Sequence, residues 1–261
     1  MRSGVDDRGQ RSGDRVRRAG RYLRLGRPLL PGAARPRAAA LVVCCAIFVA
    51  AVGVLVAHHT TADRFDHAID APVVAWFGGH RGLALRLALP GSLVPAIMIS
   101  AAIVVVCVLA GRLNGALLAL AAVPVAEAVT EYLVKPLVHR TILGGIAYPS
   151  GHTTAIVALA ATVTVLLLGP PRPGGAIAAR GAILAAAYAL VVGVAIGLIG
   201  LRWHYFTDTV AGAAVGAGTV CALALALDLE VVRRLLAHVD RTGDPAERHR
   251  PSAGEAPRRL G

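Results

Sequence analysis

Long apolar runs alternate with short polar segments through most of this 261-residue sequence. Each run is close to the ~20 residues that an α-helix needs to cross about 30 Å of hydrocarbon. Inside a bilayer the backbone must satisfy its own hydrogen bonds, so the pattern predicts an all-α, polytopic membrane protein built as a six-helix bundle. The expected spans cover residues 39–58, 92–111, 115–135, 153–169, 181–200 and 209–227.

Composition supports this membrane class and divides the chain into three parts. The mean hydropathy is +0.64 and 56% of the residues are hydrophobic, which is too apolar for an ordinary soluble domain. Eighteen of the 27 Lys and Arg residues lie in the flanking segments 1–38 and 228–261. We expect a disordered basic tail over 1–38, a transmembrane domain over 39–227, and a basic, mostly disordered tail over 228–261. Membrane lipids, and not nucleic acid, are the expected partners of this charge.

Positive charge is also distributed unevenly between the segments that join the spans. With the amino terminus in the cytoplasm, the cytoplasmic segments hold 21 of the 27 cationic residues, as the positive-inside rule requires. Both termini are then cytoplasmic, and the loops 136–152 and 200–208 meet on the extracytoplasmic face. The segment 59–91 lies on that face too, either as an amphipathic piece at the membrane interface or as a connecting loop.

The stretch 131–154 holds the polar residues with the clearest chemical signal. Lys135 is the only lysine in the chain. It follows Glu127 and Glu131 at four-residue intervals, which places the three side chains on one helical face. A Glu131–Lys135 pair would keep the ammonium charged beside lipid. A purely structural ion pair at a helix end is the alternative.

The segment 149–152, Pro-Ser-Gly-His, directly precedes a long apolar run. Ser150 is suited to cap the helix that follows, and Gly151 lets the backbone turn tightly. The free N–H groups at this helix start then form an anion site, with Lys135 and Arg140 close in the sequence. We interpret these residues as candidate phosphate ligands, although ordinary helix capping also explains a Ser-Gly turn.

A third polar group, residues 202–208, enters the last expected span. His204 and Asp208 are four residues apart, so within a helix the carboxylate can accept a hydrogen bond from one ring nitrogen. The other nitrogen is then free to act as a nucleophile. A His–Asp pair at this spacing is common by chance. The hypothesis therefore depends on its meeting His152, the single lysine and the anion-binding turn on one membrane face.

Together these residues resemble the type 2 phosphatidic acid phosphatase (PAP2) superfamily of membrane phosphatases. That family has a lysine followed by an Arg-Pro, the quartet Pro-Ser-Gly-His, and the pattern Ser-Arg-x5-His-x3-Asp. Lys135 matches the first motif, residues 149–152 reproduce the quartet, and His204 with Asp208 match the end of the third. The order of the motifs and the six-span layout agree as well, and the resemblance covers roughly residues 90–230.

The sequence departs from the family pattern at two arginines. The family arginine that follows the lysine falls on Ile142, and the one that precedes the nucleophilic histidine falls on Leu198. Arg140 and Arg202 are close enough in sequence to supply the missing guanidinium groups, which is our hypothesis and not part of the motif. Without such groups turnover would be weak or absent, because unneutralised phosphate oxygens oppose nucleophilic attack.

The resemblance implies a lipid phosphate or pyrophosphate phosphatase of the cell membrane that needs neither a metal nor another cofactor. His204, oriented by Asp208, is expected to attack phosphorus and form a phosphohistidine, while His152 protonates the leaving oxygen and then activates water. The phosphoryl oxygens would be held by Ser150, Gly151, Lys135, Arg140 and Arg202. Polyprenyl (undecaprenyl or decaprenyl) pyrophosphate is the leading expected substrate. Phosphatidic acid, phosphatidylglycerophosphate or a polyprenyl-phosphosugar would fit the same pocket.

Other functions compete with this one. An acceptor hydroxyl in place of water would make the protein a phosphotransferase. The apolar residues Ile142 and Leu198 favour a non-catalytic protein that binds lipid phosphates. A metal site formed by His152, His204 and Asp208 is disfavoured because the neighbouring cations would repel a metal ion. Transport is disfavoured because the charges cluster on one membrane face, with no polar track toward the other.

Overall fold

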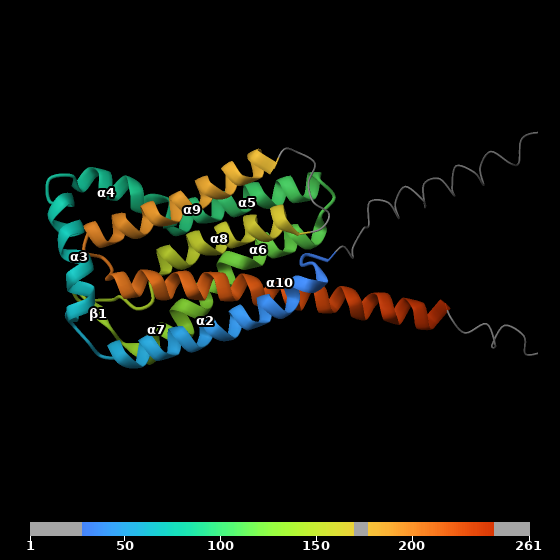
Figure 1. Cartoon of the computed structure of the whole chain (residues 1–261), viewed down its shortest axis with the longest axis horizontal. Coiled ribbons are helices and arrows are strands. Elements are labelled where there is room, and N and C mark those ends of the chain that lie inside the picture. The colour runs from blue at the N-terminus through green and yellow to red at the C-terminus, as the bar shows by residue number, and fades with distance from the viewer. Residues whose placement is uncertain (1–27, 170–176, 243–261) are drawn as a thin grey trace, which may run out of the picture.

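The computed structural model describes residues 28–169 and 177–242. The regular elements over these residues are helices, apart from one two-stranded hairpin. The long helices lie side by side in a bundle, and the shorter elements gather at one of its ends (Figure 1). In order, the elements are η1 (Gly32–Ala34), α2 (Arg35–Val56), α3 (Arg64–Phe77), α4 (Arg81–Ala88), η2 (Leu89–Gly91), α5 (Leu93–Leu109), α6 (Leu113–Ala128), η3 (Val129–Val134), α7 (Lys135–Val138), β1 (Thr141–Ile142), β2 (Gly145–Ile146), α8 (Gly151–Leu168), α9 (Ile177–Gly200) and α10 (Phe206–Thr242).

The membrane spans expected from the sequence are present as helices. Within the described ranges, five helical stretches are long and apolar enough to cross a membrane. They are α2 with η1, the continuous α6–η3–α7 unit, α8, α9 and the first part of α10. The α4–η2 unit and α5, which meet at an angle of 45°, form a sixth candidate. The predicted all-helical, multi-pass membrane fold is thus confirmed.

Helix α8 occupies the centre of the bundle and carries part of the candidate site at its first turn. It packs against α5, α6, α9 and α10, and most of its side chains are buried. Its close contact with α10 depends on glycine. A Cβ at Gly216 would lie only 2.6 Å from the Thr154 carbonyl oxygen and 3.0 Å from the Ala158 nitrogen. Small residues at this crossing let the two backbones approach closely, as is typical of helix pairs in membranes.

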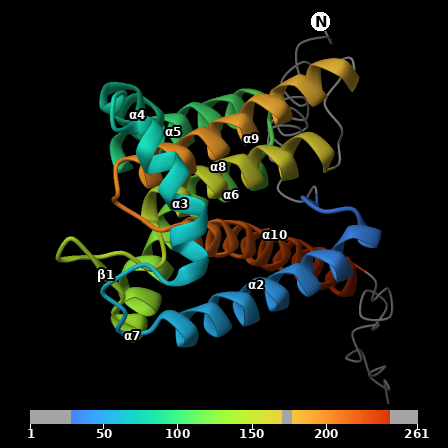
Figure 2. The ribbon, with the colours of Figure 1, turned by 60° about the vertical axis from the view of Figure 1, so that its left-hand side comes forward.

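The segment 59–91 forms the two helices α3 and α4. Asp63 caps α3 by accepting a hydrogen bond of 2.8 Å from the Asp66 backbone nitrogen. Helix α3 runs across the end of the bundle and contacts α9 and α10 (Figure 2). It buries the side chains of Asp66 and Asp70 against them. This placement brings two carboxylates from outside the sequence motifs to the same end of the bundle as those motifs.

Two helix ends differ from the predicted tails. Helix α2 begins at Arg35, within the expected amino-terminal tail, and α10 continues to Thr242, beyond the expected end of the last span. Asp228 explains part of the difference. Its buried carboxylate accepts hydrogen bonds from the backbone nitrogens of Leu29 (2.6 Å) and Leu30 (3.0 Å), and it pairs with Arg35 at 3.6 Å. The remainder of both expected tails, residues 1–27 and 243–261, lies outside the described residues.

The short hairpin β1–β2 joins α7 to α8. Thr141 pairs with Ile146 and Ile142 with Gly145 in antiparallel register, and Gly144 turns the chain with a φ of +84°. Beyond the hairpin, the buried Tyr148 hydroxyl donates a hydrogen bond of 2.7 Å to a carbonyl of α2. The end of this loop that precedes α8 is therefore anchored to α2.

Candidate active site

A cavity of about 440 Å³ opens at the end of the bundle where the sequence motifs meet. Its walls come from the start of α5, the α6–η3–α7 unit, the hairpin, the first turn of α8 and the loop that precedes α10. The lining residues are Gly91, Leu93, Glu127, Glu131, Lys135, Ile142, Leu143, Gly145, Ile146, Gly151, His152, Ala155, Arg202, Trp203 and His204.

The first turn of α8 forms the floor of this cavity. Ser150 is fully buried and caps the helix by accepting hydrogen bonds from the Thr153 backbone nitrogen (3.3 Å) and hydroxyl (3.2 Å). Gly151 lies close to the two glutamates, since a Cβ there would be 3.0 Å from Oε2 of Glu127 and 3.2 Å from Oε1 of Glu131. The positive end of the α8 dipole therefore faces the cavity, while Ser150 itself serves as the cap.

Lys135 pairs with Glu131 one helical turn away, as the sequence predicts. Its ammonium donates to Oε1 of Glu131 at 2.5 Å, and both residues line the cavity. Glu127 lies one turn further in, and its buried Oε1 accepts no hydrogen bond from the described residues. The η3 segment, which contains Glu131 and ends directly before Lys135, is π-helical, a local distortion that is frequent at functional sites. The cavity thus combines one lysine with two carboxylates.

His204 is held in a defined orientation by the backbone of the hairpin loop. Its Nδ1 lies 2.9 Å from the Ala147 carbonyl oxygen. Because a carbonyl oxygen can only accept, Nδ1 carries the proton and Nε2 keeps its lone pair. Burial, together with the nearby His152 and Lys135, lowers the pKa of His204 to about 3. The imidazole is therefore neutral at ordinary pH, as a nucleophile must be.

The two histidines of the motifs meet across the cavity. The ring centroids of His152 and His204 are 6.4 Å apart, and the Trp203 ring lies 6.1 Å from that of His152. Arg202, with a φ of +60°, lines the same cavity. Two imidazoles, two cationic side chains and a helix amino terminus therefore surround one space that is large enough for a phosphoryl group.

The family comparison agrees with this geometry. Residues 120–230 match the model of the PAP2 superfamily. The chain contains a PAP2 domain. A search of the curated proteins and a search of the solved structures returned no match. The superfamily implies lipid phosphates as substrates, and its phosphatases are typically metal-independent hydrolases.

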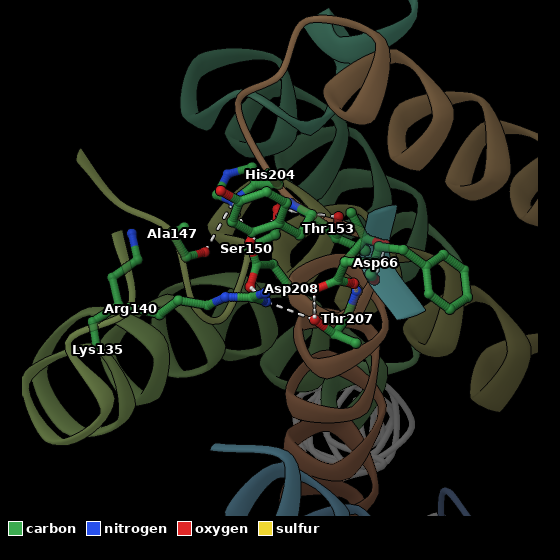
Figure 3. Close-up of polar contacts among 12 residues, drawn as sticks. Asp66, Lys135, Arg140, Ala147, Ser150, Thr153, His204, Thr207 and Asp208 are labelled. Atoms are coloured by element: carbon green, nitrogen blue, oxygen red, sulfur yellow. Dashed lines mark hydrogen bonds and ion pairs between the residues drawn. The ribbon is translucent and has the colours of Figure 1, made fainter. Parts of the chain in front are cut away.

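Arg140 of the PAP2 domain lies behind the cavity, outside the set of lining residues. Its side chain is fully buried, and one terminal nitrogen donates to Asp208 (2.8 Å) and to the Thr207 hydroxyl (2.6 Å). The other terminal nitrogen donates to Asp66 (Figure 3). Burial alone would lower the pKa of Arg140, but the charges of Asp208 and Asp66 raise it, so the guanidinium stays charged.

Asp208 contacts its surroundings differently from the expected His–Asp pair. Its Oδ2 accepts a hydrogen bond of 2.9 Å from the Tyr205 backbone nitrogen, which caps the start of α10. The distance from this oxygen to Nδ1 of His204 is 3.9 Å, longer than a hydrogen bond. In this structure, therefore, Ala147 is the direct partner of the His204 ring.

The two positions where the PAP2 domain lacks its arginines have different surroundings. Ile142 lines the cavity from strand β1. Leu198 is fully buried in the apolar core and lies outside the lining set. Lys135 and Arg202 are the cationic side chains that line the cavity among the described residues.

The cavity thus brings together Lys135, Gly151, His152, Arg202 and His204, while Arg140, Ser150 and Asp208 lie behind its wall. Asp66 was missed by the sequence reasoning. A signal existed, since Asp66 and Asp70 are four residues apart in a largely apolar segment, and buried carboxylates on one helical face need partners. No group of three His, Cys, Asp or Glu side chains in the described ranges is arranged to hold a metal ion.

Asp70 offers a test of the electrostatics beside Arg140. Burial and the charge of Asp66 raise the pKa of Asp70 to about 7 from its ordinary value of 3.8. Between these two values the folded protein keeps a proton that the unfolded chain releases, so stability falls as pH rises through this window. We expect Asp70→Asn to raise the thermal midpoint above that of wild type at pH 8. The gain should shrink toward pH 4 in detergent melting curves, and a gain that grows toward acid pH would contradict the assignment.

Proposed function

We propose that this protein is a membrane lipid phosphate phosphatase in which His204 is the nucleophile. The observation that carries the proposal is the single cavity between membrane helices that joins His204 to His152, Lys135, Arg202 and the amino terminus of α8. In this proposal the cavity opens on the extracytoplasmic face of the cell membrane and both termini are cytoplasmic, as the distribution of positive charge favours.

The reaction would proceed by two in-line displacements. Nε2 of His204 attacks phosphorus, the bond from phosphorus to the leaving oxygen breaks, and His152 gives that oxygen a proton. His152 then takes a proton from water, the resulting hydroxide attacks phosphorus, and the N–P bond breaks to release phosphate. Lys135, Arg202 and the N–H groups at the start of α8 stabilise the charge on the phosphoryl oxygens.

Apolar side chains around the cavity favour a lipid as the leaving group. Leu143 and Ile146 of the hairpin are 82% and 45% exposed, and Leu93 at the start of α5 is 59% exposed, although all three line the cavity. A headgroup can enter the polar floor while its chain lies along these residues in the bilayer. Polyprenyl (undecaprenyl or decaprenyl) pyrophosphate is the leading substrate, with phosphatidic acid and phosphatidylglycerophosphate as alternatives.

A phosphate-release screen with purified protein in lipid–detergent micelles tests this function. The panel contains a polyprenyl pyrophosphate, the matching monophosphate, phosphatidic acid, phosphatidylglycerophosphate and a water-soluble phosphate ester. We expect release from at least one lipid and little from the soluble ester. Arg202→Ala should lower kcat/KM by ~10²-fold, because it removes one of the cations that face the phosphate. Arg81→Ala, an exposed arginine on α4 outside the cavity, is the matched control.

A second candidate function is binding of lipid phosphates without turnover. It is favoured by the apolar Ile142 and by the two carboxylates, Glu127 and Glu131, which offset the two cations of the cavity. Saturable binding of a lipid from the panel, with no phosphate released from any member, would establish this function and exclude the phosphatase.

A further inference from the structure

Asp66 is a buried carboxylate on α3, outside the residues that match the PAP2 model. Its side chain is fully buried, and its carboxylate accepts hydrogen bonds from Arg140 and Thr207. Oδ1 accepts a hydrogen bond of 2.9 Å from the Thr207 backbone nitrogen, and Oδ2 accepts one of 2.9 Å from the Thr207 hydroxyl. Oδ2 also accepts a hydrogen bond from Arg140 (Figure 3). One side chain of α3 thus contacts both segments that surround His204.

Both terminal nitrogens of the Arg140 guanidinium bind protein groups. They donate to Asp66, Thr207 or Asp208, and the plane lies over the Tyr205 ring, 4.3 Å from its centroid. Its Nε is buried without a partner among the described residues. Arg140 is fully buried and is not among the residues that line the cavity, so its donors do not face a phosphate bound there. The arginine instead binds the loop before α10 to the base of the hairpin.

A short chain of hydrogen bonds connects this cluster to the nucleophile. The Arg140 carbonyl oxygen accepts a hydrogen bond of 2.9 Å from the Ala147 nitrogen, and the Ala147 carbonyl oxygen is the partner of Nδ1 of His204. The loop that carries His204 is fixed at its other end by Thr207 and Asp208. The imidazole is therefore held between two segments, and Arg140 and Asp66 bind both of them.

We propose that Asp66 is a positioning residue for the His204 nucleophile, acting through Arg140 and Thr207, and that Arg140 positions the site without binding phosphate. The positively charged Arg140 lies between the carboxylates of Asp66 and Asp208, and all three side chains are buried. Loss of either carboxylate leaves the guanidinium with one charged partner in a buried site, and the hairpin base is then free to shift. The activity readout of this inference rests on the proposed phosphatase function, whereas its structural readout does not.

The first test compares Asp66→Asn with Asp63→Asn. Both replace a carboxylate of α3 by an amide of equal size, and asparagine keeps the helix cap that Asp63 provides. We expect Asp66→Asn to lower kcat by ~10²-fold with little change in KM, as a displaced nucleophile does, whereas Asp63→Asn stays near wild type. Combining Asp66→Asn with Arg140→Gln should cost little more than either change alone. Additive losses, with a raised KM for Arg140→Gln, would show that Arg140 binds phosphate and would overturn the proposal.

A milder pair keeps the proposal testable if the Asp66 variant does not fold. Thr207→Val removes the hydroxyl that bonds to Asp66 and Arg140 but keeps the shape of the side chain, whereas Thr207→Ser keeps the hydroxyl. We expect the valine variant to lose roughly tenfold in kcat and the serine variant to retain most of it. Equal rates in the two variants would contradict the positioning role.

The structural readout is the rate at which diethyl pyrocarbonate modifies His204, followed on its peptide by mass spectrometry. A ring released from Ala147 should react several-fold faster, so Asp66→Asn and Thr207→Val should speed modification, and Asp63→Asn and Thr207→Ser should not. If wild type releases no phosphate from any lipid but the modification rates follow this order, the phosphatase proposal fails and the positioning role stands. Unchanged rates in all four variants would overturn the positioning role itself.

Discussion

Replacement of His204 by alanine is expected to abolish phosphate release, with a fall in kcat on the order of 10⁴-fold or more, because the proposed reaction loses its nucleophile. The structure gives the reason for so large an effect. His204 is the histidine whose Nδ1 proton is held by Ala147, and its low pKa of about 3 keeps Nε2 free for attack. Phosphate release is measured on the lipid that gives the highest wild-type rate. His67→Ala, an exposed histidine on α3, serves as the control.

Trapping of the covalent intermediate separates a nucleophile from a residue that merely binds. With a labelled substrate that has a good leaving group, His152→Ala should still form the phosphohistidine but should hydrolyse it slowly, so acid-labile label accumulates on the protein. His204→Ala should accumulate none. Label that persists in the His204 variant, or wild-type turnover in it, would contradict the assignment of the nucleophile.

Replacement of Gly212 by alanine is expected to destabilise the protein and to disturb the site. A Cβ at this position of α10 would collide with the Ser150 carbonyl oxygen and would lie 3.2 Å from the Thr154 hydroxyl. The obstacle is the backbone of α8 at its first turn, which cannot rotate away as a flexible side chain could. Overpacking of this kind costs about 1–3 kcal/mol in a well-packed core. The displaced turn also carries His152, so activity should fall together with the thermal midpoint.

A second glycine supplies the control for this substitution. Gly181 also lies within a helix, α9, but nothing lies within 4 Å of a Cβ placed there. Gly181→Ala should therefore stabilise the protein by up to about 1 kcal/mol, the ordinary gain in helix propensity. Opposite shifts of the melting temperature in detergent are the expected result. A midpoint that rises in both variants would show that α8 and α10 are not packed as closely as described.

The membrane helices could be predicted from the sequence because each depends on a local property. A run such as 93–109 is apolar over its whole length, and a helix is the structure that satisfies its backbone in lipid. The ends of the helices were less predictable. Helix α10 extends past the apolar run, and α2 begins before the expected span. An ion pair between Arg35 and Asp228 joins these two helices, and its two residues are far apart in the sequence.

Some contacts of the candidate site could likewise be predicted from the sequence, and others could not. Lys135 and Glu131 are one helical turn apart, so their pairing follows from helix geometry and is present in the structure. Arg140 was expected to bind phosphate because it is near the lysine in the sequence. In the folded chain it is directed to Asp66, 74 residues away, and to Asp208, 68 residues away. Distance along the chain could not decide between a cavity and a buried ion-pair network.

The sequence by itself determined the all-helical membrane fold and the PAP2 domain, and it supplied the candidate residues for the proposed chemistry, because apolar length and short motifs act locally. The tertiary structure decided which cations face the cavity, which carbonyl sets the tautomer of His204, and that a helix outside the matched region contributes Asp66. These depend on the direction of side chains after the helices have packed. A buried charge takes the partner that packing brings within reach, and no pattern along the chain specifies that partner.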